Sequence, residues 1–280
     1  MSSYNLKRLL QPKSIALFGG LWIENVANQI KNSNFKGNVW PINPHRKSIA
    51  GYKCFQDISD LPGVPDTAFI GVNRTKTLEI LTKLNEVGCG GATCFAAGFS
   101  EVDKYGKQLQ KKLSKASKDM PFLGPNCYGY INYLDHIHMW PDQHGGKEVE
   151  KGVAIIAQSS NIAINLTMNT RSTPISYVLT TGNQAKIDMS DLGLAMINDK
   201  RVTAIGIYIE GFKDIKKFEK MAFSALRSNI PIVVLKSGKT DLSKKQSISH
   251  TASITGDSDI SSAFLKRLGL CLIHISEPTR

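Results

Sequence analysis

The stretch Ser14-Ile15-Ala16-Leu17-Phe18-Gly19-Gly20 decides how we expect this chain to fold. Its apolar run has the length of a buried strand, and the two glycines allow a turn into a predicted helix over 23–32. Short β-branched runs alternate with amphipathic segments in the same manner along the rest of the chain. This alternation predicts parallel sheets with crossover helices, an α/β fold.

The predicted elements form two series with an irregular stretch between them. The first series has strands at 14–18, 38–42, 67–72, 92–95 and 121–123, with helices at 23–32, 76–87 and 105–118. The second has strands at 153–157, 175–179, 204–209 and 230–235, with helices at 161–169, 187–197, 212–228 and 257–268. We therefore expect domains over 1–132 and 151–269, a linker over 133–150, and an atypical tail over 270–280 whose sequence suggests a non-native origin.

Composition excludes several classes of protein. Of the 280 residues, 41% are hydrophobic and 21% charged, and no apolar run approaches the roughly 20 residues that span a bilayer. No signal peptide is recognisable, so we expect a cytoplasmic protein without a membrane partner. An odd number of cysteines without metal-ligand spacing favours reduced thiols: Cys54, Cys89, Cys94, Cys127 and Cys271. We also expect His136, His138 and His144 to be surface or packing residues, so no metal site is predicted.

The net charge of +12 raises the hypothesis of a nucleic-acid partner. The lysines are spread over predicted helix faces, however, without interleaved aromatic residues or a nucleic-acid motif. A solvated basic surface explains them better, and a polyanionic small ligand would use part of it. We expect no nucleic acid to bind.

The turn at Gly19-Gly20 suggests a ligand whose phosphates meet a helix N-terminus, although a domain without any nucleotide remains an alternative. An NAD site would need G-x-G-x-x-G here and a carboxylate after the second strand. The second strand instead ends in Asn43-Pro44-His45-Arg46. This neutral-to-basic corner disfavours an NAD-linked oxidoreductase and tolerates a 3′-phosphorylated adenosine.

The stretch Ser249-His250-Thr251-Ala252-Ser253-Ile254-Thr255-Gly256 places a histidine among small hydroxyl residues. A neutral imidazole is a nucleophile near pH 7 that can accept and pass on a phosphoryl group, but a capping loop with an exposed histidine is an alternative. Glu210, which closes a predicted strand, could accept the second imidazole N–H, unless it is a surface glutamate in a turn. Ser159, Ser160 and Asn161 begin a predicted helix and either bind phosphate or merely cap the helix.

Eight motifs occur in an order and at a spacing that resemble those of the NDP-forming acyl-CoA synthetases, and within them the branch of ADP-forming acetate–CoA ligases. This branch is related to the α subunit of succinyl-CoA synthetase. The motifs are Pro12-Lys13-Ser14-Ile15-Ala16, Asn43-Pro44, Ala97-Gly98-Phe99, Gly124-Pro125-Asn126-Cys127, Gln158-Ser159-Ser160-Asn161, Gly182-Asn183-Gln184, Tyr208-Ile209-Glu210-Gly211 and Ser249-His250-Thr251.

The resemblance implies a Rossmann-like CoA-binding domain followed by a flavodoxin-like ligase domain. It implies that His250 carries phosphate, that Glu210 supports it, and that Ser159, Ser160, Asn161, Gly182 and Asn183 bind phosphate. The residues that it implies for CoA are Gly19, Gly20, Asn43, Pro44, Val72, Asn73, Ala97, Gly98, Phe99, Asn126 and Cys127. The family usually has glycine where Ser160 stands.

In the family, acyl phosphate forms from acyl-CoA and phosphate, the histidine takes the phosphoryl group, and a mobile loop passes it to ADP. No ATP-grasp segment follows His250, so ATP or ADP and Mg²⁺ are expected on an ATP-grasp β subunit or a fused C-terminal domain. A small carboxylic acid is the expected substrate, in an oligomeric enzyme. A non-catalytic CoA-binding regulatory or scaffold module is the rival hypothesis, but it would not need His250, Glu210 and Ser159 together.

Overall fold

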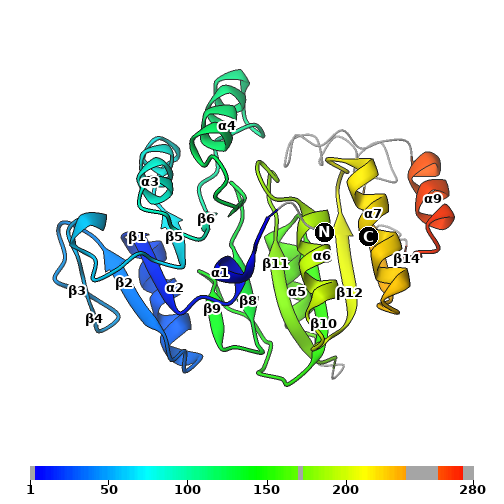
Figure 1. The fold of residues 1–280 in the computed structure, drawn as a ribbon, viewed down its shortest axis with the longest axis horizontal. Helices are drawn as coiled ribbons and strands as arrows, with labels where there is room; N and C mark the ends of the chain where they lie inside the picture. Colours follow the sequence, from blue (N-terminus) through cyan, green and yellow to red (C-terminus); the bar gives the residue numbers. More distant parts are fainter. Residues whose placement is uncertain (1–3, 170–172, 238–257, 274–280) are drawn as a thin grey trace, which may run out of the picture.

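The computed structural model describes residues 4–169, 173–237 and 258–273. Two sheets lie side by side and helices pack against them, with the first sheet in the blue-to-green part of the chain and the second in the green-to-orange part (Figure 1). One buried apolar cluster reaches from Leu9 and Ile23 in the first half of the chain to Ile207 and Leu265 in the second. The two halves therefore share a core.

The first sheet is parallel throughout and has the order β2-β1-β5-β6-β7. Its strands are β1 (Ser14–Gly19), β2 (Asn38–Ile42), β5 (Thr67–Gly71), β6 (Ala92–Cys94) and β7 (Phe122–Leu123). Its helices are α1 (Lys7–Leu10), α2 (Leu21–Asn32), α3 (Arg74–Glu86) and α4 (Lys104–Ala116). A hairpin of β3 (Ser48–Ile49) and β4 (Tyr52–Lys53) and a 3₁₀ turn (Ile58–Asp60) connect β2 to β5.

The second sheet has the order β14-β13-β12-β10-β11-β8-β9. Its strands are β8 (Tyr130–Asn132), β9 (Ile137–Met139), β10 (Gly152–Ala157), β11 (Ile175–Thr180), β12 (Val202–Ile209), β13 (Ile232–Lys236) and β14 (Cys271–Ile273). Its helices are α5 (Ser160–Thr167), α6 (Met189–Asn198), α7 (Ile215–Arg227) and α9 (Ser258–Arg267). The strands from β10 to β14 are parallel, whereas β8 pairs antiparallel with β11.

Numbered in chain order, the parallel strands of each sheet follow the sequence 2-1-3-4-5, the doubly wound arrangement found in flavodoxin-like domains. In such sheets the strand order reverses beside the first strand, and ligands bind at the carboxyl ends of the strands there. The prediction of a Rossmann-like domain followed by a flavodoxin-like domain is confirmed. The reversal points lie between β1 and β5 and between β10 and β12.

Polar caps explain where several of the helices begin. The side chains of Asn73, Asp103 and Asp214 accept a hydrogen bond from a backbone N–H in the first turn of α3, α4 and α7. Asp188 caps α6 in a reciprocal capping box with Asp191. Each cap satisfies N–H groups that the helix itself leaves without an acceptor. All four caps follow strand ends, so the helices return over the sheets.

The expectation that residues 133–150 are irregular is wrong for β9, which pairs with β8 at the edge of the second sheet. Ile137 and Met139 are buried there, and the first-domain helix α2 packs against this strand. Ser33 also donates a hydrogen bond to the His136 carbonyl oxygen at 2.6 Å. Part of the expected linker is therefore a structural bridge between the domains. In the tail expected over 270–280, residues 271–273 form strand β14 on β13.

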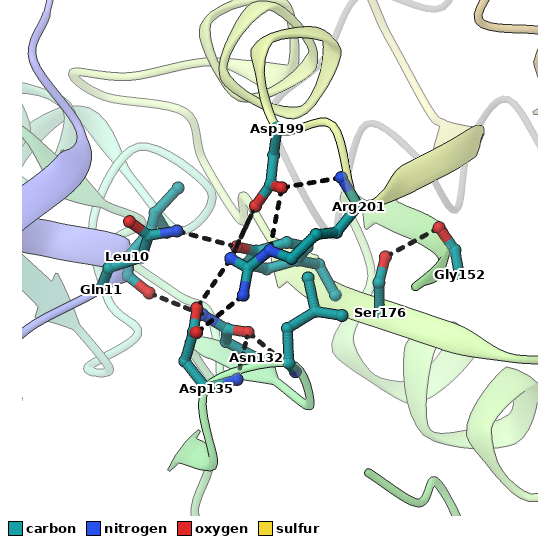
Figure 2. A network of polar contacts seen from close by, with 10 residues as sticks. Leu10, Gln11, Asn132, Asp135, Gly152, Ser176, Asp199 and Arg201 are labelled. Atoms are coloured by element: carbon teal, nitrogen blue, oxygen red, sulfur yellow. Dashed lines mark hydrogen bonds and ion pairs between the residues drawn. The ribbon is translucent and has the colours of Figure 1, made fainter. Parts of the chain in front are cut away.

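A polar network at the opposite end of the bridge ties β8 and α1 to the second domain (Figure 2). Arg201 binds Asp135 with both terminal nitrogens, at 2.8 and 3.0 Å, and also reaches Asp199 at 2.9 Å. Asn132 donates to the Leu10 carbonyl oxygen at 3.0 Å and to Asp135 at 2.8 Å. The guanidinium thereby joins the loop after β8 to the start of β12.

Candidate active site

A cavity of about 500 Å³ lies at the reversal point of the first sheet, between the ends of β1 and β5. Six of the residues that the resemblance assigned to CoA line it: Gly19, Gly20, Asn43, Pro44, Val72 and Asn73. The remaining lining residues include His45, Asp57, Lys76 and Lys83, which that assignment did not contain. The structure therefore gathers the residues from three separate strand ends around one space.

The backbone at Gly19 accepts no other residue. Its φ is +141°, and a Cβ there would lie 2.6 Å from the Gly71 carbonyl oxygen on the neighbouring strand. Asn43 holds the same corner, because its amide donates to the Gly19 carbonyl oxygen at 2.7 Å and accepts from the His45 N–H at 2.9 Å. Asn43 therefore shapes the turn that borders the cavity.

The cavity is suited to an anionic ligand. The N-termini of α2 and α3 both begin among its lining residues, at Gly20 and Asn73, and helix N-termini carry partial positive charge. Lys76 and Lys83 add cationic side chains, of which Lys83 pairs with Asp57 at 2.9 Å. No carboxylate follows β2, where an NAD site would need one. A phosphorylated adenosine fits this donor set.

The other five residues assigned to CoA lie elsewhere, at the seam between the domains. Ala97, Gly98 and Phe99 follow β6, and Asn126 and Cys127 follow β7. The Asn126 N–H donates to the Ala96 carbonyl oxygen at 2.9 Å, which joins the two loops. These residues do not line the 500 Å³ cavity. The structure thus divides the predicted CoA set into a cavity and a seam.

Cys127 is buried, with 2% of its surface exposed, and its thiol lies 3.9 Å from the Cys94 carbonyl oxygen. Burial raises the pKa of the Cys127 thiol to about 12, although hydrogen bonds from Gly129 and Thr180 oppose this. The thiol is therefore protonated at neutral pH and faces the interior. It is unsuited to act as a nucleophile.

The reversal point of the second sheet brings Glu210 to the start of α5. Gln158, at the end of β10, accepts hydrogen bonds from the N–H groups of Glu210 and Gly211 at 2.6 and 2.9 Å. Ser159 is the N-cap residue of α5 but makes no side-chain cap bond, and Asn161 is exposed in the first turn. The structure confirms that these segments adjoin, and it adds Gln158 as the residue that joins them.

Two further groups complete this end of the second domain. Lys236 donates to the Glu210 carbonyl oxygen at 3.0 Å, and burial lowers the pKa of its ammonium group while the Glu210 charge opposes that shift. Ser160 accepts a hydrogen bond from the Tyr128 N–H at 3.0 Å, so the start of α5 touches the chain beyond β7. The backbone of Glu210, the ammonium group of Lys236 and the residue that precedes the N-cap of α5 therefore lie near one another.

A row of aromatic rings runs from the start of α2 to the chain beyond β7. Trp22, in the first turn of α2, packs in a tilted arrangement against Phe95 at 4.8 Å between ring centroids, and Phe95 contacts Tyr128 at 5.7 Å. Trp22 is 43% exposed although it is large and apolar. Because the Tyr128 N–H also donates to Ser160, the row extends from the first turn of α2 to the start of α5. No periodic pattern in the sequence predicts this row.

The loop of Gly182 and Asn183 packs on the first domain. The Asn183 N–H donates to the Pro125 carbonyl oxygen at 3.0 Å, and the Ala185 N–H donates to that of Gly124 at 2.9 Å. Gly182 has φ +50°, and a Cβ there would collide with the Pro125 and Asn126 carbonyl oxygens. The loop expected to bind phosphate is therefore also an interdomain contact.

His250 lies outside the described residues, so its predicted role stays a prediction. Within the part of the chain that is described, no group of three histidine, cysteine, aspartate or glutamate side chains gathers as a metal site would require. No helix of that part is long and apolar enough to cross a membrane.

Comparison with known proteins decides the family. Residues 13–133 match a model described as a CoA binding domain, and residues 150–277 match one described as a succinyl-CoA ligase like flavodoxin domain. The chain belongs to the two families that these models describe, with the CoA binding domain first and the succinyl-CoA ligase like flavodoxin domain second. Residues 134–149, between β8 and β10, separate the two matched segments. This arrangement agrees with two consecutive domains.

Several proteins similar to this chain are named as ADP-forming acetate–CoA ligases or as an acetyl-coenzyme A synthetase. It is 34% identical, over 98% of its length, to a protein of Methanocaldococcus jannaschii named acetate–CoA ligase (ADP-forming). It is 28% identical, over 96%, to the α subunit of acetate–CoA ligase (ADP-forming) II of Pyrococcus furiosus. A solved structure titled Ca. Korarchaeum cryptofilum dinucleotide forming acetyl-coenzyme A synthetase 1, in complex with phosphate and ADP, superposes on 96% of the chain with a TM-score of 0.86 and 30% identity.

The chain spans only part of each of these proteins. It covers 39% of the Methanocaldococcus protein, 60% of the Pyrococcus α subunit and 59% of the Korarchaeum chain.

Proposed function

We propose that this chain is the CoA-binding and phosphohistidine-bearing part of an ADP-forming acyl-CoA synthetase. One observation carries the proposal: Gln158 holds Glu210 beside the start of α5, at the reversal point of a flavodoxin-like sheet. A CoA-binding scaffold would not need the backbone of a glutamate anchored beside a helix N-terminus. A phosphoryl-transfer site needs both, because phosphate requires positive dipoles and an attacking imidazole requires a proton acceptor.

In the first step, we propose that phosphate bound at the start of α5 attacks the carbonyl carbon of an acyl-CoA. The new bond joins a phosphate oxygen to the acyl carbon, the carbon–sulfur bond breaks, and CoA leaves as its thiol. The cavity at Gly19 and Asn43 would hold the adenosine part of CoA. Ser159 and Ser160 would orient the phosphate, with the α5 dipole favouring its negative charge.

In the second step, an imidazole nitrogen of His250 attacks the phosphorus of the acyl phosphate. The phosphorus–oxygen bond to the acyl group breaks, and the carboxylate leaves as the acid. Glu210 would accept the N–H of the other imidazole nitrogen and stabilise the cation that develops. Reversal of both steps would make acyl-CoA from acid, CoA and a phosphorylated His250.

The remaining partners follow from the same proposal. We expect ADP or ATP and Mg²⁺ to bind an ATP-grasp β subunit or fused C-terminal domain, with the complete enzyme a cytoplasmic oligomer. Relatives are named for acetate, 4-hydroxybutyrate and trans-feruloyl substrates, so the acid is sought among carboxylic acids of that range. The aromatic row of Trp22, Phe95 and Tyr128 would place apolar surface next to the acyl group.

Arsenolysis tests the first step with this chain alone. Arsenate would attack the thioester as phosphate does, and the acyl arsenate would hydrolyse in water, so that loss of the thioester absorbance proceeds without ADP. We expect arsenate-dependent cleavage of at least one of acetyl-CoA, 4-hydroxybutyryl-CoA and feruloyl-CoA. Tight binding of CoA without cleavage of any thioester would instead establish a regulatory or scaffold module.

A further inference from the structure

Glu101 occupies an unusual position in the seam between the domains. One carboxylate oxygen accepts the Gly98 N–H at 2.6 Å, and the Phe99 N–H lies 3.1 and 3.2 Å from the two oxygens. Gly98 has φ +95°, and successive N–H groups in such a turn form a small anion-binding concavity. The chain's own carboxylate fills this concavity, so the turn after β6 is fixed by Glu101.

The second oxygen of Glu101 reaches across the seam. It accepts a hydrogen bond from the side-chain amide of Asn183, 82 residues further along the chain. The same Asn183 amide donates to Gln110 of α4 at 3.0 Å. The carboxylate thus connects a turn of the first domain to the loop that follows β11 in the second.

All donors of Asn183 are used in these contacts. Its side-chain nitrogen bonds Glu101 and Gln110, and its backbone N–H donates to the Pro125 carbonyl oxygen at 3.0 Å. Its side-chain oxygen accepts from Asn126 at 3.4 Å. Direct binding of phosphate by this side chain would require these bonds to break. Asn183 is better explained as the second-domain half of an interdomain clamp.

We propose that Glu101 is a positioning residue, whose carboxylate clamps the turn at Gly98 to the loop at Asn183 and so sets the two ligand-binding ends at reacting distance. This inference rests on the proposed function, because it assumes that CoA binds one domain and phosphate the other. Reacting atoms must approach to about 3–3.5 Å, and a displacement of about 1 Å can cost on the order of 100-fold in rate. A clamp at the seam controls that displacement.

The donor and acceptor pattern offers a sharp test. In Glu101→Gln, the glutamine oxygen can still accept from Gly98 and Phe99, but its amide then faces the amide of Asn183, donor against donor. In Asn183→Asp, two carboxylates face each other. In the double variant, the amide at position 101 can donate to the carboxylate at position 183, and Gln110 can rotate its amide to donate as well. The hydrogen bond between positions 101 and 183 is thereby restored, with position 101 now the donor and position 183 the acceptor.

We expect each single variant to lower the kcat of arsenolysis by about 10- to 100-fold. The KM for acyl-CoA should change much less, because neither Glu101 nor Asn183 lines the cavity at Gly19. The double variant should recover at least 10-fold over the Asn183→Asp single variant. Glu219→Gln, which removes a surface carboxylate paired with Arg267 at 2.7 Å, is the matched control and should behave as wild type. Full activity of Glu101→Gln, or no recovery in the double variant, would overturn the proposal.

Hydrogen exchange supplies a measurement that does not depend on activity. The N–H groups of Asn183 and Ala185, bonded across the seam to Pro125 and Gly124, should exchange faster in Glu101→Gln and regain protection in the double variant. If wild type shows no arsenolysis but these shifts occur, the proposed function fails and the clamp stands. If exchange at both groups is unchanged in Glu101→Gln, the clamp is refuted whatever the activity.

Discussion

Replacing Arg201 with methionine removes the only cation that contacts both Asp135 and Asp199 within the part of the chain that is described, and keeps much of the side-chain volume (Figure 2). Asp135 would lose a bidentate partner at 2.8 and 3.0 Å, and Asp199 would lose one at 2.9 Å. Asp199 is the more enclosed carboxylate, with 14% of its side chain exposed. The variant therefore leaves two carboxylates near each other without a neutralising charge.

The stability lost in Arg201→Met depends on how deeply the side chains of Arg201, Asp135 and Asp199 are buried. Removing one partner of a well-buried pair costs about 3–5 kcal/mol, whereas exposed pairs contribute about 0–1 kcal/mol. The side chains of Arg201 and Asp135 are 35% and 32% exposed, so solvent screens part of the interaction. We expect a loss of about 2–4 kcal/mol in the free energy of unfolding at pH 7. At about 2–4 °C per kcal/mol, Tm should fall by roughly 4–16 °C.

The loss should depend on pH in a defined direction. Burial alone would raise the pKa values of Asp135 and Asp199, but the hydrogen bonds from Arg201 outweigh it and hold both below their usual range. A carboxylate with a lowered pKa in the folded state stabilises the fold above its unfolded pKa of about 3.9, and that contribution is lost as the pH falls through its folded pKa. The difference in the free energy of unfolding between wild type and variant should therefore become smaller below about pH 4.

Urea unfolding from pH 7 down to pH 3 measures this directly. Arg267→Met is the matched control, because that arginine is 62% exposed and, among the described residues, forms an ion pair only with Glu219. The substitution should lower the free energy of unfolding by less than about 1 kcal/mol at any pH. Equal stability of Arg201→Met and wild type at pH 7, or a stability difference that does not change with acid, would show that Arg201 does not stabilise the fold through Asp135 and Asp199.

Three further predictions concern the site. Gly19→Ala places a Cβ 2.6 Å from a carbonyl oxygen on β5, so CoA affinity measured by calorimetry should fall at least 10-fold; unchanged affinity would contradict the assignment of the cavity. Gln158→Leu leaves the N–H groups of Glu210 and Gly211 without the acceptor that they share. The free energy of unfolding, measured in urea, should fall by about 2–3 kcal/mol. An unchanged free energy of unfolding would show that Gln158 does not hold this turn. Cys127 should resist iodoacetamide in the native protein at pH 8, because burial raises its pKa to about 12, and rapid alkylation would disprove its enclosure.

The sequence predicted the parallel strands and their helices well, because a continuous apolar run such as 153–157 and a following polar cap are local signals. It missed the hairpin of β8 and β9. His136, His138 and Asp135 interrupt the apolar residues there, and the strands are stabilised by α2, a helix more than 100 residues earlier, as the Ser33 bond to His136 shows. Short strands whose partners are distant leave no pattern in their own residues.

The same limit applies to the site. Motif order proposed Glu210, Ser159 and the cavity residues as site residues. Each follows a strand end, and the ends of parallel strands meet at one edge of a sheet. It did not identify Glu101, whose partner Asn183 lies 82 residues away, nor did it separate the cavity from the seam. The contact between Glu101 and Asn183 and the division between cavity and seam depend on how the two sheets pack together. No single sequence motif predicts that packing.

We propose that His250 carries phosphate with support from Glu210. The direct measurement is acid-labile, base-stable label on the chain after incubation with an acyl-CoA that it cleaves and ³²P-phosphate, located by mass spectrometry. We predict label on His250, none in His250→Asn, and at least 10-fold slower labelling in Glu210→Gln. Label on another residue, or undiminished labelling in His250→Asn, would contradict the account.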